Sequence, residues 1–388
     1  MDTAGAEVVG QLSQQLATIS PSTLIGEGKV QELRELCEAQ GATLVIFDEE
    51  LSPAQGQNLE AELKIRVMDR AEIILDIFAT RARSHEAKLQ VELAQMRYML
   101  PRLRRMWTHL SRIRGGIGLR GPGETQLETD RRMIRKKISY LVEKLGDWER
   151  HRETVRAGRD VMLTAALVGY TNAGKSSLLR SFSGEHDIFV EDRLFATLDT
   201  LTRMVDLGEG YKARMTDTVG FSRKLPHHLV ASFRATLEEA READVLLHVV
   251  DASHPEWQAQ VAVVHGVLQE LGLGELPVAM VFNKLDAVED ETAFVRDARH
   301  VYPDAQFTST LRTDGIIALK RHLQDLAKAG KLTARVLVPF ALAAKAASLY
   351  REMEVLERKD GEQGTELLVR AEGWQIERLR EAGLEVAL

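Results

Sequence analysis

One octapeptide of the form G-x-x-x-x-G-K-S constrains the fold of this chain more than any other stretch. An apolar run, 161–168, precedes it and suits a buried parallel strand, and the segment that follows, 177–182, suits a helix. That order wraps backbone N–H groups around phosphates at a helix N-terminus, so it predicts a nucleotide-binding α/β fold. The octapeptide consists of Gly169, Tyr170, Thr171, Asn172, Ala173, Gly174, Lys175 and Ser176.

The side chains of this loop indicate how it would hold a nucleoside triphosphate. Lys175 is expected to reach the β- and γ-phosphates, and the hydroxyl of Ser176 is expected to bind Mg²⁺. We expect every residue of the loop, together with Ser177, to contact the nucleotide, because successive N–H groups of such a loop point inward.

A second segment, of the form D-x-x-G, follows a predicted β-hairpin. The carboxylate of Asp217 is expected to hold Mg²⁺, and the N–H of Gly220 is expected to touch the γ-phosphate. Between the loop and the hairpin, Thr197 is our candidate for a further Mg²⁺ ligand, with Thr200 and Thr202 as alternatives. The predicted catalytic residues are Lys175, Thr197 and Gly220, and the predicted metal ligands are Ser176, Thr197 and Asp217.

A third segment, N-K-x-D, predicts guanine as the base. It consists of Asn283, Lys284 and Asp286, and it ends an apolar strand candidate, 277–282. An aspartate here accepts hydrogen bonds from N1–H and the exocyclic N2–H of guanine, whereas adenine would leave the carboxylate unpaired. Ser309 and Thr310, after another short strand, are the predicted backbone contact to the guanine oxygen.

The residue after D-x-x-G indicates slow hydrolysis. Many related enzymes place a glutamine there to orient the attacking water, but this chain has Phe221. We therefore expect slow intrinsic turnover of GTP to GDP and stimulation by a partner. Asn172 could help to hold K⁺ beside the phosphates, so K⁺ is a candidate cofactor beside Mg²⁺. His248, on an apolar strand, is expected to be a core residue.

Composition bounds the setting of the chain. The single cysteine, Cys37, excludes a disulfide framework. No signal peptide is evident, and no apolar run approaches the roughly 20 residues that span a bilayer. We expect a cytoplasmic monomer with no membrane span and no DNA partner. The net charge of −7 means that any nucleic-acid contact must come from a local basic patch.

The pattern divides the chain into four predicted units. We expect an N-terminal α/β domain over 1–83, an antiparallel helical hairpin over 84–157, a doubly wound, mostly parallel GTPase domain over 158–330, and a small C-terminal α/β domain over 331–388. The N-terminal strand candidates are 43–47 and 73–78. In the C-terminal unit we predict strands at 335–338 and 365–369 and a helix from Phe340 to about Leu356.

The predicted hairpin carries an uneven charge. Its two helices flank a glycine-rich tip, 115–123, and seven arginines with no acid lie between Arg97 and Arg120. Such a run repels itself unless phosphates neutralise it, which favours RNA contact over a solvated helix face. Tyr98 and Trp107 could stack on bases, although aromatic residues at helical spacing also suit a core. The predicted RNA-binding residues are Arg102, Arg104, Arg105, Arg112, Arg114 and Arg120.

Several of these segments together resemble the HflX-type GTPases. The resemblance is carried by the glycine-rich stretch 115–132, the phosphate loop, F-A-T-L-D at 195–199, D-T-V-G-F at 217–221 and L-P-H-H-L-V at 225–230. It extends over roughly 25–326. The family usually has Ser-Ala where this chain has Ser309-Thr310, and a proline where this chain has Thr200.

The resemblance implies a GTPase that binds the large ribosomal subunit and its RNA, with hydrolysis accelerated by that subunit. It implies that the N-terminal domain and hairpin reach towards the peptidyl-transferase region, and that the protein splits stalled or idle ribosomes in a stress response. In some members ATP hydrolysis is reported as well. The alternatives are a GTPase of RNA modification or ribosome assembly, and a signalling switch whose basic hairpin grips an acidic surface.

Overall fold

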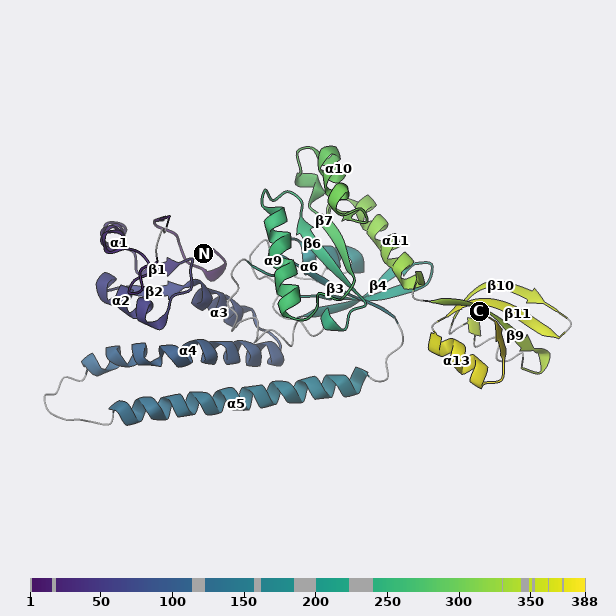
Figure 1. Cartoon of the computed structure of the whole chain (residues 1–388), viewed down its shortest axis with the longest axis horizontal. Coiled ribbons are helices and arrows are strands. Elements are labelled where there is room, and N and C mark those ends of the chain that lie inside the picture. The colour runs from purple at the N-terminus through teal and green to yellow at the C-terminus, as the bar shows by residue number, and fades with distance from the viewer. Residues whose placement is uncertain are drawn as a thin grey trace.

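The computed structural model shows an elongated molecule (Figure 1). A large central sheet lies between an N-terminal unit with a long helical hairpin and a smaller C-terminal unit. No helix among the described residues is long and apolar enough to cross a membrane. The structure describes residues 2–15, 19–113, 123–156, 162–184, 200–222, 240–329, 331–342, 349–350, 353–361, 363–371 and 373–387.

The central domain is built on a six-stranded sheet with strand order β4-β5-β3-β6-β7-β8. Only β4 is antiparallel to its neighbour, so the sheet is the mostly parallel α/β sheet that the motifs predicted. The predicted hairpin, the predicted parallel strands and the short strand before Ser309 are all present. The strands are β3 (Leu163–Gly169), β4 (Leu201–Gly208), β5 (Tyr211–Asp217), β6 (Val245–Asp251), β7 (Val278–Asn283) and β8 (Gln306–Phe307).

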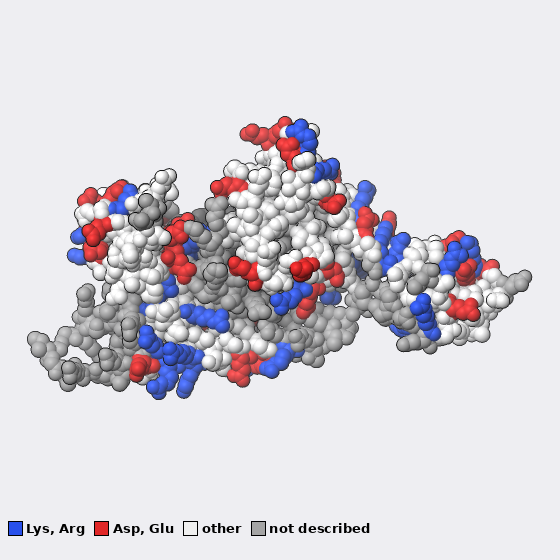
Figure 2. Space-filling model, in the orientation of Figure 1, with Lys and Arg blue, Asp and Glu red and all other residues white. Residues whose placement is uncertain are grey.

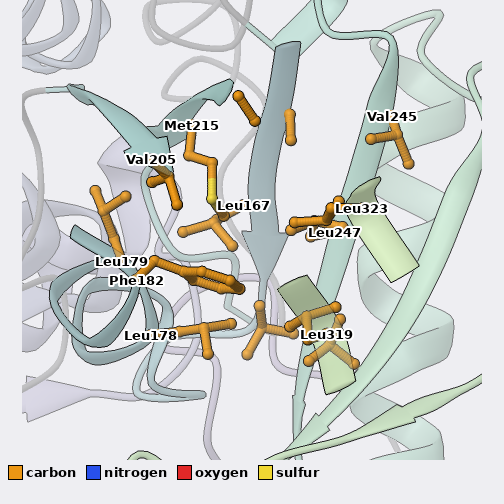
Figure 3. Packing of buried hydrophobic residues seen from close by; sticks show 14 of the residues in the cluster. Leu167, Leu178, Leu179, Phe182, Val205, Met215, Val245, Leu247, Leu319 and Leu323 are labelled. Carbon is orange, nitrogen blue, oxygen red and sulfur yellow. The ribbon is translucent and has the colours of Figure 1, made fainter. Parts of the chain in front are cut away.

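Helices cover this sheet and complete its core. Figure 3 shows Leu167 and Leu247 from the sheet packed with Leu178 of α6 and with Leu319 and Leu323 of α11. His248 is a core residue, as expected: it is 1% exposed, and its ring lies edge-on to that of His265. The elements around the sheet are α6 (Lys175–Ser183), α9 (Trp257–Glu270), the 3-10 turn η2 (Leu285–Ala287), α10 (Glu291–Val301) and α11 (Thr313–Ala329).

The N-terminal unit corrects one prediction. Residues 73–78 belong to a helix, not to a strand. Asp69 caps that helix by accepting from the Glu72 N–H, and a short apolar run of this kind cannot be assigned by periodicity alone. The second strand, which the sequence did not indicate, is β2, parallel to β1. The elements are η1 (Asp2–Ala4), α1 (Glu27–Gln40), β1 (Leu44–Phe47), α2 (Pro53–Leu63), β2 (Arg66–Asp69) and α3 (Arg70–Arg81).

The helical hairpin consists of α4 (His85–Ile113) and α5 (Gly123–Arg156), and Pro101 lies within α4. The two helices run side by side below the N-terminal unit and the central domain (Figure 1). They pack through buried leucines at Leu93, Leu141 and Leu145, so the apolar faces of the two helices meet. An ion pair between Glu92 and Lys137, at 3.1 Å, also joins them.

The C-terminal unit is a four-stranded antiparallel sheet of order β10-β11-β9-β12. The two predicted strands are present. The predicted helix from Phe340 to about Leu356 is wrong at its end, because β10 begins at Glu354 and pairs with β11. The elements are β9 (Leu332–Pro339), the 3-10 turn η3 (Phe340–Leu342), β10 (Glu354–Asp360), β11 (Gly364–Ala371), α13 (Gly373–Glu381) and β12 (Glu385–Ala387).

Candidate functional site

The predicted phosphate loop joins the carboxyl end of β3 to the N-terminus of α6. Lys175 opens α6, is 6% exposed, and its Nζ donates to the carbonyl oxygens of Gly169 (3.2 Å) and Tyr170 (3.0 Å). Burial lowers the pKa of the Lys175 ammonium to about 8, although the nearby Asp217 carboxylate acts in the opposite direction. A buried cation next to the N-terminus of a helix is suited to polyphosphate, in agreement with the predicted role of Lys175.

Two predicted metal ligands meet beside this lysine. Ser176 Oγ donates to Asp217 Oδ2 at 2.5 Å, and Asp217 is fully buried at the end of β5. A hydroxyl and a carboxylate so placed fit a Mg²⁺ ion that takes its remaining ligands from water and phosphate oxygens. The third predicted ligand, Thr197, lies outside the described residues. Its alternative Thr202 is on β4, where its hydroxyl contacts Thr216 Oγ1 at 2.9 Å.

The guanine segment contacts the phosphate loop directly. Asn283 is 1% exposed, and its Nδ2 donates to the carbonyl oxygen of Ala173 at 3.0 Å. Gly174 has φ +91°, and a Cβ there would lie 2.2 Å from Asn283 Nδ2, so only glycine admits this contact. The two motifs therefore hold the base end and the phosphate end in a fixed relation.

The remaining base-end residues surround Asn283. Lys284 Nζ pairs with Asp251 Oδ2 at 2.8 Å, and Asp286 is exposed in η2. Ser309 is buried, and its Oγ accepts from the Leu311 N–H, while Thr310 is partly exposed. These side chains belong to the ends of β6, β7 and β8, which is where a doubly wound sheet binds its ligands.

Two supporting residues were missed from the sequence. Thr308 is buried, and its Oγ1 donates to Asn283 Oδ1 at 3.3 Å, which helps to fix the amide orientation. Asp251 holds Lys284. The only sequence evidence for a role of Asp251 was its place at the end of an apolar strand. For Thr308 the only evidence was its place next to Ser309.

Gly220 and Phe221 lie against the phosphate loop. The Phe221 N–H donates to the Gly169 carbonyl (3.0 Å), and the Thr171 N–H donates to the Phe221 carbonyl (2.7 Å). The Phe221 side chain is 2% exposed and packs with Ala166 and other apolar residues behind the sheet. It is therefore turned into the core and has no polar atom with which to orient water.

The structure corrects one predicted RNA contact. Arg102 is 9% exposed, and its guanidinium pairs with Asp69 Oδ2 at 3.1 Å, donates to the Leu51 carbonyl and stacks on Tyr98. Asp69 and Tyr98 are buried too, so Arg102 and Tyr98 anchor α4 to the N-terminal unit and do not face RNA. The side chains of Trp107, Arg104, Arg105 and Arg112, and the whole of Arg114 and Arg120, lie outside the described part of the chain.

Three family descriptions match successive parts of the chain. Residues 1–79 match the "GTP-binding GTPase N-terminal" family, residues 81–159 match the "GTP-binding GTPase Middle Region" family, and residues 164–284 match the "50S ribosome-binding GTPase" family. Among solved structures, a GTP-binding protein of the archaeon Sulfolobus solfataricus in complex with GDP is 24% identical, with a TM-score of 0.44, over 84% of this chain and 92% of that one.

Curated relatives are closer. The protein GTPase HflX of Lacrimispora saccharolytica is 44% identical over 93% of this chain and 85% of its own length. GTPase HflX of Flavobacterium psychrophilum is 48% identical over 75% of this chain and 70% of its own, and that of Escherichia coli is 49% identical over 75% and 68%. With the phosphate loop, D-x-x-G and N-K-x-D assembled at one sheet edge, the chain belongs to the HflX family of GTPases.

Proposed function

We propose that this chain is a GTPase of the large ribosomal subunit that uses GTP binding and hydrolysis to act on ribosomes, splitting stalled or idle ribosomes under stress. The observation that carries the proposal is that one chain joins two features: motif residues predicted to bind guanine nucleotide, gathered at one sheet edge, and a long basic hairpin. The chain also matches a family described as a 50S ribosome-binding GTPase. GTP, GDP and Mg²⁺ are its ligands.

The chemistry proposed for the site uses residues whose positions are described above. Lys175 would neutralise charge on the β- and γ-phosphates, and the Gly220 N–H would contact the γ-phosphate. Ser176 and Asp217 would hold Mg²⁺, which supplies charge neutralisation at the phosphate oxygens when bound. Asp286 would accept from guanine, with Ser309 and Thr310 beside it.

Slow turnover of the isolated protein follows from Phe221. Since that side chain is buried in the core, no group at the usual position orients the attacking water. We propose that the large subunit supplies or orders the missing group. Turnover of the purified chain at about 1 s⁻¹ or faster, against roughly 10⁻³ s⁻¹ or less for unassisted switches, would contradict this step.

The basic hairpin is the proposed RNA-contacting element. Figure 2 shows Lys and Arg gathered along the lower face of the molecule over the first half of α5. Such a face can neutralise RNA phosphates. The basic charge is local to it, because the chain as a whole carries a net charge of −7. The exposed or partly exposed residues of α5 that form it are Arg131, Arg132, Arg135, Lys136 and Lys137. From α4 and the tip we retain Arg104, Arg105, Arg112, Arg114 and Arg120 as proposed contacts.

The decisive experiment is the GTPase rate with and without purified large subunits. It is run on the wild type, on a triple variant with Ala at Arg112, Arg114 and Arg120, and on a control triple variant with Ala at Arg296, Arg299 and Arg321, which are exposed on the central domain. We expect strong stimulation of the wild type and the control and weak stimulation of the hairpin variant. Absence of stimulation in the wild type would remove the ribosome proposal.

Sedimentation then separates splitting from assembly. A splitting factor should convert intact ribosomes to subunits in a GTP-dependent manner and migrate with mature large subunits. An assembly or RNA-modification factor should migrate with precursor particles and leave intact ribosomes unchanged.

A monovalent cation is part of the proposal. Asn172 has φ +62°, a left-handed conformation that asparagine tolerates, within the loop that wraps the phosphates. We propose that its side chain helps to hold K⁺ there. Equal GTPase rates in KCl and NaCl at matched ionic strength would remove K⁺ from the mechanism.

A further inference from the structure

Two cations lie at the end of the site where the base is predicted to bind. Lys284 stands two residues before Asp286, and Arg312 lies in the loop that follows β8. The two segments are in contact, because the Leu285 N–H donates to the Thr308 carbonyl oxygen at 3.2 Å. A carboxylate attracts any cation within a few ångströms, so each of these cations is a potential competitor of guanine for Asp286.

Arg312 is held by a different carboxylate. Its Nη1 donates to Glu291 Oε2 at 2.9 Å, and its Nη2 donates to Glu291 Oε1 at 2.6 Å. Such a two-point pair fixes the plane of the guanidinium as well as its position. Glu291 is the first residue of α10, so the pair also joins the loop after β8 to the start of that helix.

Lys284 is held in a comparable way. Its Nζ pairs with Asp251 Oδ2 at 2.8 Å, and Ser253 donates to the other carboxylate oxygen, Oδ1, from both its N–H and its Oγ. Each of the two cations is therefore matched by a carboxylate other than Asp286.

Asp286 is exposed and forms no ion pair with any residue that the structure describes. It is still close to the Glu291–Arg312 pair. The pKa of Arg312 is raised above its ordinary value, mainly by the hydrogen bonds to Glu291 and to a smaller extent by nearby negative charges, among them that of Asp286. A guanidinium released by Glu291 would therefore have Asp286 within electrostatic reach.

We propose that Glu291 is a specificity-determining residue of the base end, because it holds Arg312 and so keeps the Asp286 carboxylate available to guanine. Without Glu291, Arg312 pairs with Asp286, and guanine has to displace it before its N1–H and N2–H can donate to that carboxylate. Adenine has no such donors, so its binding does not depend on Asp286 in this way. The inference rests on the proposed recognition of guanine by Asp286 and is independent of any action on ribosomes.

Four variants of the full chain test this role. Glu291→Gln releases Arg312, Arg312→Gln removes the competing charge, and the double variant carries both changes. The control is Asp297→Asn, which releases Arg296 from an exposed pair of 2.9 Å on the same helix. The readouts are melting temperature and the dissociation constants for GDP and ADP, measured without ribosomes.

We expect Glu291→Gln to weaken GDP binding by about threefold to fivefold, the size of the contribution of a well-formed exposed ion pair, and to leave ADP binding unchanged. Arg312→Gln, the double variant and the control should bind GDP within about twofold of the wild type. Loss of an acidic residue from the first turn of α10 also weakens that helix, but the single and double variants share this loss. Recovery of GDP binding in the double variant therefore reports the competing charge.

Salt provides a second readout that a packing defect would not change. The defect of Glu291→Gln relative to the wild type should shrink between about 0.05 M and 0.5 M KCl, because dissolved ions screen exposed charges.

Two results would overturn the inference. One is GDP binding by Glu291→Gln that is less than about twofold weaker than wild type at the lower salt concentration. The other is a double variant that binds GDP as weakly as Glu291→Gln does, which would make the pair only a structural link between the loop and α10. A wild type that bound no GDP would instead remove the proposed guanine site, and this inference with it, so the two failures can be told apart.

Discussion

The two ends of the nucleotide site are supported in different ways. At the base end, Asn283 is held by Ala173 and Thr308, and Lys284 is held by Asp251, all within the central domain. At the γ-phosphate end, Gly220 sits between residues that contact α3 of the N-terminal unit. The predicted base-binding residues are thus held within one domain, whereas the predicted γ-phosphate-binding glycine is flanked by residues that contact two.

The largest expected effect concerns Lys175, which serves the phosphate end alone. Lys175→Ala should weaken GTP and GDP binding by about 100-fold or more, because it deletes a charge-assisted contact in a buried site. Equilibrium titration with a fluorescent nucleotide measures it. Lys212→Ala, which removes an exposed lysine of β5, is the control and should bind normally. Near-normal binding by Lys175→Ala would mean that the phosphates lie elsewhere.

Asp286→Asn tests the base end. The amide would present a hydrogen-bond donor where guanine also presents one, so the affinity for GTP should fall by about 100-fold or more. The affinity for xanthosine triphosphate should rise. Asp290→Asn, which retains the cap of α10, is the matched control. If the base end is self-contained, the ratio of affinities for triphosphate and diphosphate of the preferred base should not change. A changed ratio would break the comparison between the two ends.

A pH series tests the phosphate end without a substitution. Burial lowers the pKa of Lys175 to about 8 in the nucleotide-free protein, and phosphates favour the charged form. Above pH 8, binding must therefore take up a proton, so affinity should fall by up to about tenfold per pH unit, and below pH 8 it should level off. Lys175→Arg should lose this dependence. A flat profile to pH 9.5 in the wild type would contradict the low pKa.

The sequence predicted that the motif residues lie together better than it predicted the structure around them. The chemistry of phosphate and guanine imposes fixed spacings on the motif residues. Each of them could therefore be identified from the sequence: the loop, Asp217, Gly220, Asn283 and Asp286. Residues 73–78 were misassigned because an apolar stretch of six residues suits both a strand and a buried helix, and only the cap at Asp69 decides.

Tertiary pairing accounts for the other misses. Arg102 reads as part of a polycation in the sequence, but its charge is matched by Asp69, 33 residues earlier in the chain. The contacts of Val219 with α3 and of Arg70 with Ser222 could not be predicted either, because nothing in the local sequence marks these residues as neighbours. Contacts of this kind depend on how the domains pack together, and the spacing of residues along the chain does not predict that packing.

The smallest expected effect sharpens the comparison most. Thr308→Val removes the hydroxyl that donates to Asn283 Oδ1 and keeps the side-chain shape, so it should weaken GTP and GDP binding equally, by about threefold to tenfold. Thr308→Ser, which retains the hydroxyl, should bind nearly as the wild type does. Among the described residues, Asn283 contacts Ala173 and Thr308, which both belong to the central domain, so the GTP-to-GDP ratio should stay constant. If Thr308→Val shifted that ratio, the base end would affect binding of the third phosphate, and the two ends would have to be treated as one coupled unit.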